Sequence, residues 1–311
     1  MLRQVAARLL TGLLVLWLAA SAAFVTVHAL PGRIEDVLAG DLSYPGLREA
    51  IAAQWGLDHS LLWQYGQFVL RLLHGDLGTS FVLQQPVSAV IVSQLWPTAQ
   101  LAGSAGVLAV LLALGVATAT AGASHAGGLG AWSARIASAG ELVCTSTPVF
   151  WGGLLLLIAF SFHWRLFPVS GAAGWRSLVL PAVTLALPTA GMLSQVMREA
   201  LDAAFERPFV TTVRARGVSE AGLRVGHLLR HALLPVVTLG GWLIGGLLGG
   251  AVITEKLFGR PGLGSITLDA VTSQDVPVVL AVVLLAAFVH VVISTALDIA
   301  YLFIDPRLRN P

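Results

Sequence analysis

Charged side chains are scarce in this sequence. Asp, Glu, Lys and Arg make up 11% of its 311 residues, whereas hydrophobic residues make up 56%. Soluble domains usually carry about a quarter charged residues. So little charge cannot cover the surface of a globule of this size, which argues against both a cytosolic enzyme and a disordered chain. The composition therefore predicts an all-α polytopic membrane protein.

Other residue types are nearly missing as well. Cys144 is the one cysteine, so an internal disulfide and a thiolate metal cluster are both excluded. Lys256 is the one lysine, and it follows Glu255 rather than a glycine-rich run, which excludes an ATP-binding P-loop. The eight histidines are scattered and form no zinc motif. The net charge of +2 reflects a small excess of Arg and predicts no nucleic-acid partner.

Long charge-free runs are the dominant feature that is present. Roughly 20 apolar residues cross the roughly 30 Å of bilayer hydrocarbon. Runs of that length predict six transmembrane helices, over residues 9–27, 97–121, 142–164, 177–197, 231–254 and 276–297. We interpret the first run as a retained anchor rather than a signal peptide, because it continues past Ala20-Ser21-Ala22 to Leu30.

The distribution of Arg predicts the orientation, because cytosolic loops carry an excess of Lys and Arg. The loop between the fourth and fifth predicted spans contains Arg198, Arg207, Arg214, Arg216, Arg224 and Arg230. The segment after the first span is instead rich in acidic residues, namely Glu35, Asp36, Asp41, Glu49, Asp58 and Asp76. We therefore expect residues 198–230, which include the loop 199–230, and both termini in the cytosol.

The outer segment 31–96 is long enough to have structure of its own. Residues 47–55 and 60–74 show helical spacing of apolar residues, and Gly75-Asp76-Leu77-Gly78 predicts a turn. Residues 87–95 predict a short amphipathic helix at the membrane face, ahead of a new helix that begins at Pro97. The segment either caps the helices or docks an extracytoplasmic partner. The chain thus divides into an N-terminal helix (1–30), this segment (31–96) and five further spans (97–311).

The 199–230 loop predicts two short helices. Pro208 begins the first, and Gly217 ends it in a left-handed cap. Ser219 caps the second, with Glu220 placed favourably against its dipole. Such a hairpin either exchanges movement with a soluble partner or is an ordinary Arg-rich inner loop.

Glycines mark two further regions. The outer loop 255–275 contains Phe258-Gly259-Arg260-Pro261-Gly262-Leu263-Gly264, which is either a plain turn or a loop that reaches a substrate or partner. In the fifth span, Gly241, Gly245 and Gly249 recur every fourth residue and let another helix approach closely. That helix belongs either to the same chain or to a second subunit.

A source of transport energy is not evident within the chain. Ion-coupled carriers usually place carboxylates deep in the membrane, whereas Glu141, Asp298 and Asp305 lie at the ends of predicted spans. A stand-alone secondary transporter is therefore the weaker alternative. A pathway without its own energy source favours a partner that supplies it.

Several short motifs occur in a fixed order along nearly the whole chain. They are Ala29-Leu30-Pro31-Gly32, Trp55-Gly56-Leu57-Asp58, Gly75-Asp76-Leu77-Gly78-Thr79-Ser80, Leu180-Pro181-Ala182-Val183-Thr184-Leu185, Phe209 to Glu220, Ala232-Leu233-Leu234-Pro235, Pro261-Gly262-Leu263-Gly264 and Asp305-Pro306-Arg307. Together they resemble the permease subunits of ABC importers in the dipeptide/oligopeptide group. The 209–235 loop resembles the EAA loop of that family, although Thr211, Thr212 and Val213 stand where the triplet falls.

The resemblance implies a type I importer permease fold in the bacterial inner membrane. It also implies that the 209–235 loop sits in a cleft of an ATPase subunit. The implied coupling residues are Arg214, Ala215, Gly217, Ser219, Glu220, Arg224, His227 and Pro235. The implied contacts with substrate or partner at the outer face are Gly75, Asp76, Gly78, Pro261, Gly262 and Gly264.

The same resemblance implies the partners and the cargo. The expected partners are a second, homologous permease, two ATP-binding subunits that hold ATP and Mg²⁺, an extracytoplasmic substrate-binding protein and the lipid bilayer. The chain itself would bind no cofactor or metal and perform no covalent chemistry. Di- and oligopeptides are the expected cargo, with nickel, haem and glutathione as alternatives.

Overall fold

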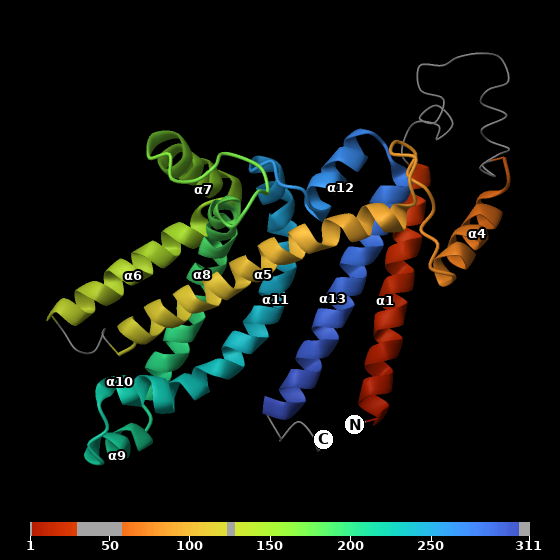
Figure 1. Cartoon of the computed structure of the whole chain (residues 1–311). Helices are drawn as coiled ribbons and strands as arrows, with labels where there is room; N and C mark the ends of the chain where they lie inside the picture. The colour runs from red at the N-terminus through yellow and green to blue at the C-terminus, as the bar shows by residue number, and fades with distance from the viewer. Residues whose placement is uncertain (1, 30–57, 123–127, 305–311) are drawn as a thin grey trace. The chain divides into compact units, whose positions relative to one another are not determined.

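The computed structural model describes residues 2–29, 58–122 and 128–304, and this part of the chain is helical, without a β-strand (Figure 1). In chain order the helices are α1 (Leu2–Ala29), α4 (Leu61–Leu73), α5 (Val87–Thr120), α6 (Gly128–Ser146), α7 (Val149–Leu156), the π-helix η1 (Leu157–His163), α8 (Arg176–Phe205), α9 (Phe209–Ala215), α10 (Glu220–Gly222), the π-helix η2 (Leu223–Leu228), α11 (Leu229–Leu257), α12 (Leu263–Thr272) and α13 (Val276–Ile304).

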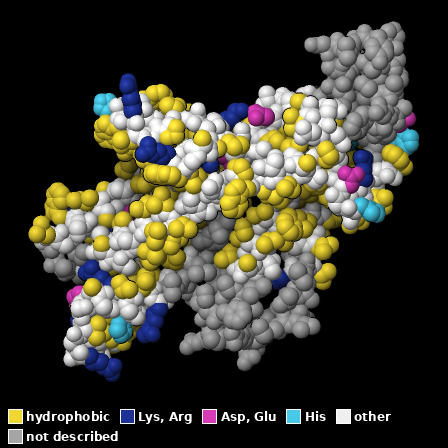
Figure 2. All heavy atoms as spheres, viewed as in Figure 1, with side chains coloured by type: hydrophobic (Ala, Val, Ile, Leu, Met, Phe, Trp, Pro, Cys, Tyr) yellow, Lys and Arg dark blue, Asp and Glu magenta, His cyan; other side chains and the backbone are white. Residues whose placement is uncertain are grey.

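Several of these helices are suited to a bilayer. Three described helices are long and apolar enough to cross it, over Val87–Thr120, Arg176–Phe205 and Val276–Leu297, and the bent pair of α6 with α7–η1 makes a fourth if it is one span. Figure 2 shows many hydrophobic side chains exposed on the face in view. On α5 alone, Val107 is 63% exposed and Leu111 is 61% exposed. Such apolar surface suits contact with lipid, while the six spans and the side of the termini stay predictions.

The third predicted span is wrong as a single helix. α6 ends at Ser146, α7 begins at Val149, and the two helix directions differ by 107°. Pro148 lies at this break, and the residue before a proline disfavours the helical region of backbone space. The absence of charge in residues 142–164 marked an apolar segment correctly but said nothing about this bend.

The start of α5 also differs from the prediction. The helix begins at Val87 and continues through Pro97 to Thr120, so Pro97 does not open a new helix. A proline inside an apolar helix removes one hydrogen bond but is tolerated when neighbouring groups compensate. The predicted boundary between residues 96 and 97 therefore lies within a single helix, and the predicted helix over 47–55 falls outside the described residues.

The chain forms two compact units. The first comprises Met1–Leu95 with Ile266–Val292, and the second comprises Trp96–Ser265 with Ile293–Pro311. In the first unit, α4 packs on α1, where the ring of Phe24 contacts the rings of Tyr65 and Phe68 at centroid distances of 5.3 and 5.5 Å. The predicted helix over 60–74 is confirmed as α4.

The second unit is built around α8, which packs against α5, α6 and α11. Small residues let these helices approach closely. The buried side chains shared by α5, α8 and α11 are Leu101, Ala105, Ala109, Ala182, Leu185, Ala186, Ala190, Leu247 and Ala251. A Cβ added at Gly250 would lie 2.6 Å from the end of the Leu185 side chain, so α8 and α11 approach closely at this point.

A buried ion pair joins α6 to α8. Arg198 donates to Glu141 at 2.5 Å, and the hydroxyl of Ser194 donates to the other oxygen of the same carboxylate at 2.6 Å. Glu141 is only 5% exposed, and a buried carboxylate without such partners would be strongly destabilising. The Glu141 carboxylate therefore holds α6 and α8 together.

Candidate functional site: the hairpin between α8 and α11

The hairpin, residues 206–228, follows α8 and contains α9, α10 and η2 (Figure 1, teal). Gly217 joins α9 to α10 with φ of +76°, and its N–H donates to the carbonyl of Arg214 at 2.9 Å. The Ser219 hydroxyl accepts from the N–H of Gly222 at 3.2 Å and so caps α10. The predicted left-handed glycine and serine cap are both confirmed.

An exposed ion pair closes the hairpin across Gly217. The Nε of Arg214 donates to one oxygen of Glu220 at 2.7 Å, and a terminal nitrogen donates to the other at 3.1 Å. The hydrogen bond from Arg214 lowers the pKa of the Glu220 carboxyl below its ordinary value. Both side chains are about half exposed, so water screens the pair and its effect on stability is modest. Its effect is to fix the direction of α10 relative to α9.

An apolar core seats the hairpin on the ends of two long helices. Its buried members from the hairpin are Val210, Val213, Leu223 and Leu228. They pack with Ala117 and Ala121 at the end of α5, and with Met197, Leu201 and Ala204 at the end of α8. Burying side chains of this size stabilises by about 1.5–3 kcal/mol each. The hairpin is thus a rigid part of the second unit.

Arg224 ties η2 to the last turn of α5. One terminal nitrogen of its guanidinium donates to the carbonyl oxygens of Thr118 and Ala119, at 3.2 Å each. The last carbonyls of a helix have no partner within it, and a cation there also opposes the negative end of the helix dipole. Arg224 therefore caps the C-terminus of α5 from a separate segment of the chain.

Phe205, at the end of α8, lies between the hairpin and the end of α5. Its ring lies 5.9 Å from the guanidinium carbon of Arg214 and 6.0 Å from that of Arg224, within the range of cation–π attraction. A Cβ added at Gly122, just after α5, would lie 3.0 Å from the same ring. The N–H of Gly122 also donates to the carboxylate of Asp202 at 2.7 Å. The ends of α5 and α8 and the hairpin thus share one set of contacts.

A second buried constellation surrounds Glu255 at the end of α11. Its carboxylate accepts from the hydroxyl of Thr98 at 2.6 Å and from the N–H of Ser265 at 3.0 Å. A Cβ on Gly262 would lie 2.2 Å from this carboxylate, and one on Gly264 would lie 2.3 Å from the backbone of α11. Pro261 is exposed, whereas both glycines are buried. The loop is therefore wrapped around Glu255.

The predicted turn at residues 75–78 is confirmed in the first unit. Gly75 and Gly78 have φ of +75° and +81°, and Asp76 accepts from the N–H of Gly78 at 2.9 Å. Further along, the Asp275 carboxylate accepts from the hydroxyl of Ser80 and from the N–H of Phe81. Asp275 thereby ties the 79–82 turn to the start of α13.

The described residues contain no cluster of three or more His, Cys, Asp or Glu side chains placed to hold a metal ion. Within this part of the chain, the polar groups found together join neighbouring helices or hold helix ends and loops.

A family described as the inner membrane component of binding-protein-dependent transport systems matches residues 114–310. The chain belongs to this family. The matched region contains the whole hairpin and the Glu255 loop, whereas Thr98, which donates to Glu255, lies before it. The predicted family, that of ABC importer permeases, is confirmed.

Named relatives match the permease over its whole length. It is 34% identical over 309 residues to the glutathione transport system permease protein GsiC of Salmonella typhimurium, with 99% of each chain covered. It is 33% identical to the protein of the same name from Escherichia coli K12, again with 99% of each chain covered. The permease also matches a solved chain of the methionine ABC transporter MetNI in an inward-facing form. That match has a TM-score of 0.55 at 19% identity and covers 69% of this chain and 96% of that one. At this identity the likeness shows the fold alone.

The structure brings some predicted coupling residues together and leaves others apart. Arg214, Gly217, Ser219, Glu220 and Arg224 all take part in the hairpin contacts described above. His227 approaches the carbonyl of Gly222 only at 3.5 Å, and Ala215 is exposed at the end of α9. Pro235 lies within α11. Contact of any of these with an ATPase stays a prediction.

The predicted packing glycines of α11 are divided in the same way. Gly245 and Gly249 are exposed, and a Cβ on either meets no described atom within 4 Å. Gly241 lies within α11. The close contact inside the chain is made instead by Gly250, next to the predicted stripe.

Sequence reasoning missed Phe205, Asp202, Gly122 and Thr118. Each acts through a partner in another element, up to about 110 positions away in the chain, so no local spacing could reveal it. One signal was present, because Gly122 opens a small Gly/Ala-rich segment directly after an apolar span. The sequence places Glu255 at the start of the 255–275 loop, but no local signal indicates that the loop closes over its carboxylate.

Proposed function

We propose that this permease forms one half of the pathway of an ATP-driven ABC importer and receives its movement through the hairpin. The observation that carries this proposal is the link from Arg224 to the last carbonyls of α5. A partner that displaces the hairpin acts directly on a long apolar helix through this link. An ordinary inner loop has no need of such a connection.

The exposed side of the hairpin would face an ATPase subunit. Its free surface includes Arg216 and Val225, and Val225 is 61% exposed. Aromatic and Arg side chains with exposed apolar neighbours are common at protein interfaces. Closure of two ATPase subunits on ATP and Mg²⁺ would then push the hairpin, α5 and α8 as one body. The hairpin and the adjoining ends of α5 and α8 share the apolar core around Val213.

The permease would pair with a second, homologous permease. The open stripe at Gly245 and Gly249 supports such a contact, because small residues let helices of two subunits approach closely. On the outer side, a substrate-binding protein would deliver cargo. The exposed Asp76 turn and Pro261 are the candidates for its contact surface.

The proposed cargo is a small peptide, with glutathione as the first candidate. The relatives that are 33–34% identical over 99% of the chain carry the name glutathione permease. Glutathione is itself a tripeptide, so this assignment agrees with the di- and oligopeptide class expected from the motifs. Nickel and haem are the alternatives.

The test is uptake into proteoliposomes that contain the permease with its cognate permease, ATPase subunits and binding protein. We expect ATP-dependent uptake of labelled glutathione, competition by short peptides, and none by nickel or haem. Uptake by the purified chain alone, driven by an ion gradient, would show a secondary transporter instead. ATP-dependent uptake of glutathione that short peptides do not inhibit would retain the importer and glutathione as its cargo, and would reject the wider peptide class.

A further inference from the structure

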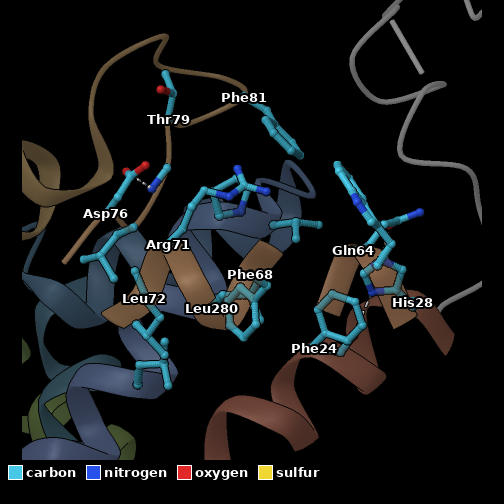
Figure 3. A pocket seen from close by; sticks show the side chains of 17 residues that line it. Phe24, His28, Gln64, Phe68, Arg71, Leu72, Asp76, Thr79, Phe81 and Leu280 are labelled. Carbon is cyan, nitrogen blue, oxygen red and sulfur yellow. Dashed lines mark hydrogen bonds between the residues drawn. The ribbon is translucent and has the colours of Figure 1, made fainter. Parts of the chain in front are cut away.

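A cavity of about 140 Å³ lies in the first unit, among α1, α4, the turn after α4 and the start of α13 (Figure 3). Its wall is largely aromatic and aliphatic and includes Phe24, Trp63, Phe68, Leu280 and Leu284. Its polar groups come from Arg71, Asp76, Thr79, His28 and Gln64. A cavity of this volume holds one small ring or a few methylene groups. It is too small for a peptide of three residues.

The walls of this cavity are the ends of apolar helices. Leu280 and Leu284 belong to the first turns of the candidate span Val276–Leu297. Phe24 belongs to the last part of the apolar stretch Leu10–Thr26 of α1. Two apolar stretches that end beside the same cavity place it where hydrocarbon gives way to the polar headgroups of a bilayer.

The character of α4 agrees with this depth. The helix is strongly amphipathic, and none of its residues is buried. Even its large apolar side chains are exposed, with Leu62 84% exposed and Leu73 79% exposed. Trp63 and Tyr65 lie on the same helix, and such rings favour the membrane interface. An amphipathic helix with large exposed apolar side chains is typical of a segment that lies in the interface plane.

One positive charge at the cavity has no partner within the described residues. Arg71 extends its guanidinium beside the cavity in Figure 3, and no described residue forms a hydrogen bond or ion pair with it. Asp76, His28 and Gln64 are already engaged. Asp76 accepts from Gly78 at 2.9 Å, and the ring nitrogens of His28 lie 2.9 Å from the Phe24 carbonyl and 3.1 Å from Gln64.

We propose that this cavity is a binding site for an anionic phospholipid. The phosphate would bind Arg71, and the upper methylene groups of one acyl chain would lie between Phe24, Phe68 and Leu280. An apolar cavity, rimmed by one cation that has no partner among the described residues, complements a ligand with one anionic group and a hydrocarbon chain. Arginine suits phosphate because its planar guanidinium can donate two parallel hydrogen bonds. The site rests on the membrane location of the chain and not on the proposed cargo.

The experiment uses the assembled importer in vesicles of phosphatidylcholine that contain a small fraction of photoactivatable phosphatidylglycerol. Labelling of this chain is measured by mass spectrometry for the unaltered protein, Arg71→Gln, Leu280→Trp and Arg176→Gln. Arg176 is the matched control, because its guanidinium lies 5.7 Å over the exposed ring of Trp175 and it is not among the residues that line the cavity. Photoactivatable phosphatidylcholine provides the neutral comparison.

We expect Arg71→Gln to reduce labelling by phosphatidylglycerol about fivefold, since an arginine near anionic lipid contributes about 1 kcal/mol. Leu280→Trp fills the cavity and should reduce labelling by a similar factor, while Arg176→Gln should not. The labelled residues should line the cavity. Equal labelling by both lipids, or equal labelling of Arg71→Gln and the unaltered protein, would show annular lipid only. An equal loss in Arg176→Gln would show a general charge effect, and any of these results overturns the proposal.

Discussion

At the scale of single residues, Gly217 determines the shape of the hairpin through its backbone and not through lack of space. A Cβ at Gly217 would meet no described atom within 4 Å, yet its φ of +76° is one that other residues adopt only with strain. Gly226 in η2 has equally open surroundings within a helical segment. The two glycines therefore form a matched pair that separates strain from crowding.

Gly217→Val should uncouple the importer while Gly226→Val leaves it working. A β-branched residue at Gly217 is strained by about 1–3 kcal/mol, so α10 should shift relative to α9. We expect ATP hydrolysis that no longer responds to the loaded binding protein, in complexes that still assemble. The measurement is ATPase stimulation in proteoliposomes, with assembly checked by co-purification. Equal ATPase stimulation in both variants would show that the hairpin is an ordinary Arg-rich loop.

Arg224→Ala should weaken coupling more than Arg216→Ala. Arg224 caps two carbonyls of α5, whereas Arg216 is exposed at the end of α9. A hydrogen bond to a charged group contributes about 1.5–3 kcal/mol, less when partly exposed, so we expect a loss of transport of about fivefold or more. Arg224→Lys should recover only part, because an ammonium lacks the guanidinium fork. Uptake rates at matched complex concentration provide the measurement, and equal rates for the two alanine variants would contradict the link.

The Arg214–Glu220 pair should lose its effect only in acid. The pKa of Glu220 is lowered by the hydrogen bond from Arg214. Its stabilisation is therefore fully present above the ordinary pKa of 4.5 and is lost as the pH falls through the lower folded-state value. The difference in melting temperature between the unaltered protein and Glu220→Gln should be small at pH 7, smaller in high salt, and absent in strong acid. A difference that persists in strong acid would contradict this assignment.

At the scale of elements, the junction of α11 with α12 depends on the absence of side chains at Gly262 and Gly264. These glycines bring the loop backbone onto Glu255, whose carboxylate then accepts from Thr98 and Ser265. A buried carboxylate needs such donors. The buried charge of Glu255 and the closed loop over Gly262 and Gly264 therefore depend on each other.

Gly264→Ala should destabilise the permease, whereas Gly115→Ala should not. A Cβ at Gly264 would lie 2.3 Å from the Val252 backbone, while one at Gly115 on α5 meets no described atom within 4 Å. Overpacking of this kind costs about 1–3 kcal/mol, which corresponds to a lower melting temperature by several degrees. The thermal transition of the purified protein tests this, and equal transitions for both variants would count against the proposed crowding.

The sequence predicted elements whose signals are local. The helix over 60–74, the turn at Gly75 and Gly78, and the caps at Gly217 and Ser219 each follow from a few adjacent residues. The bend between α6 and α7 was missed because charge counting ignores the conformation of the residue before Pro148. The contacts of Arg224 and Glu255 were missed because their partners are far apart in the sequence.

At the scale of the whole molecule, the open glycines of α11 agree with the proposed pairing of this chain with a second permease. Six predicted spans alone seldom enclose a path for a large solute. Gly245 and Gly249 lie on an exposed face of α11, and a Cβ added at either would meet no described atom within 4 Å. The proposed second permease would supply that missing partner.

Leucine at Gly245 and Gly249 should prevent pairing with the second permease. The larger side chains would hold the helices of the two subunits apart. We expect Gly245→Leu with Gly249→Leu to be inserted and folded but to lose co-purification of the partner permease. Gly115→Leu is the control, since it is an equally open helical position on α5. Retained pairing in the double variant would place the subunit contact elsewhere.

The cap that Arg224 places on α5 also limits how the importer can move. Its two hydrogen bonds are 3.2 Å long, and such bonds are lost when the separation grows by a few tenths of an ångström. A push on the hairpin must therefore carry α5 along or else leave its final turn to fray. If α5 did not follow the hairpin, the backbone amides of residues 117–120 would exchange faster, well before any change at the far end of the helix.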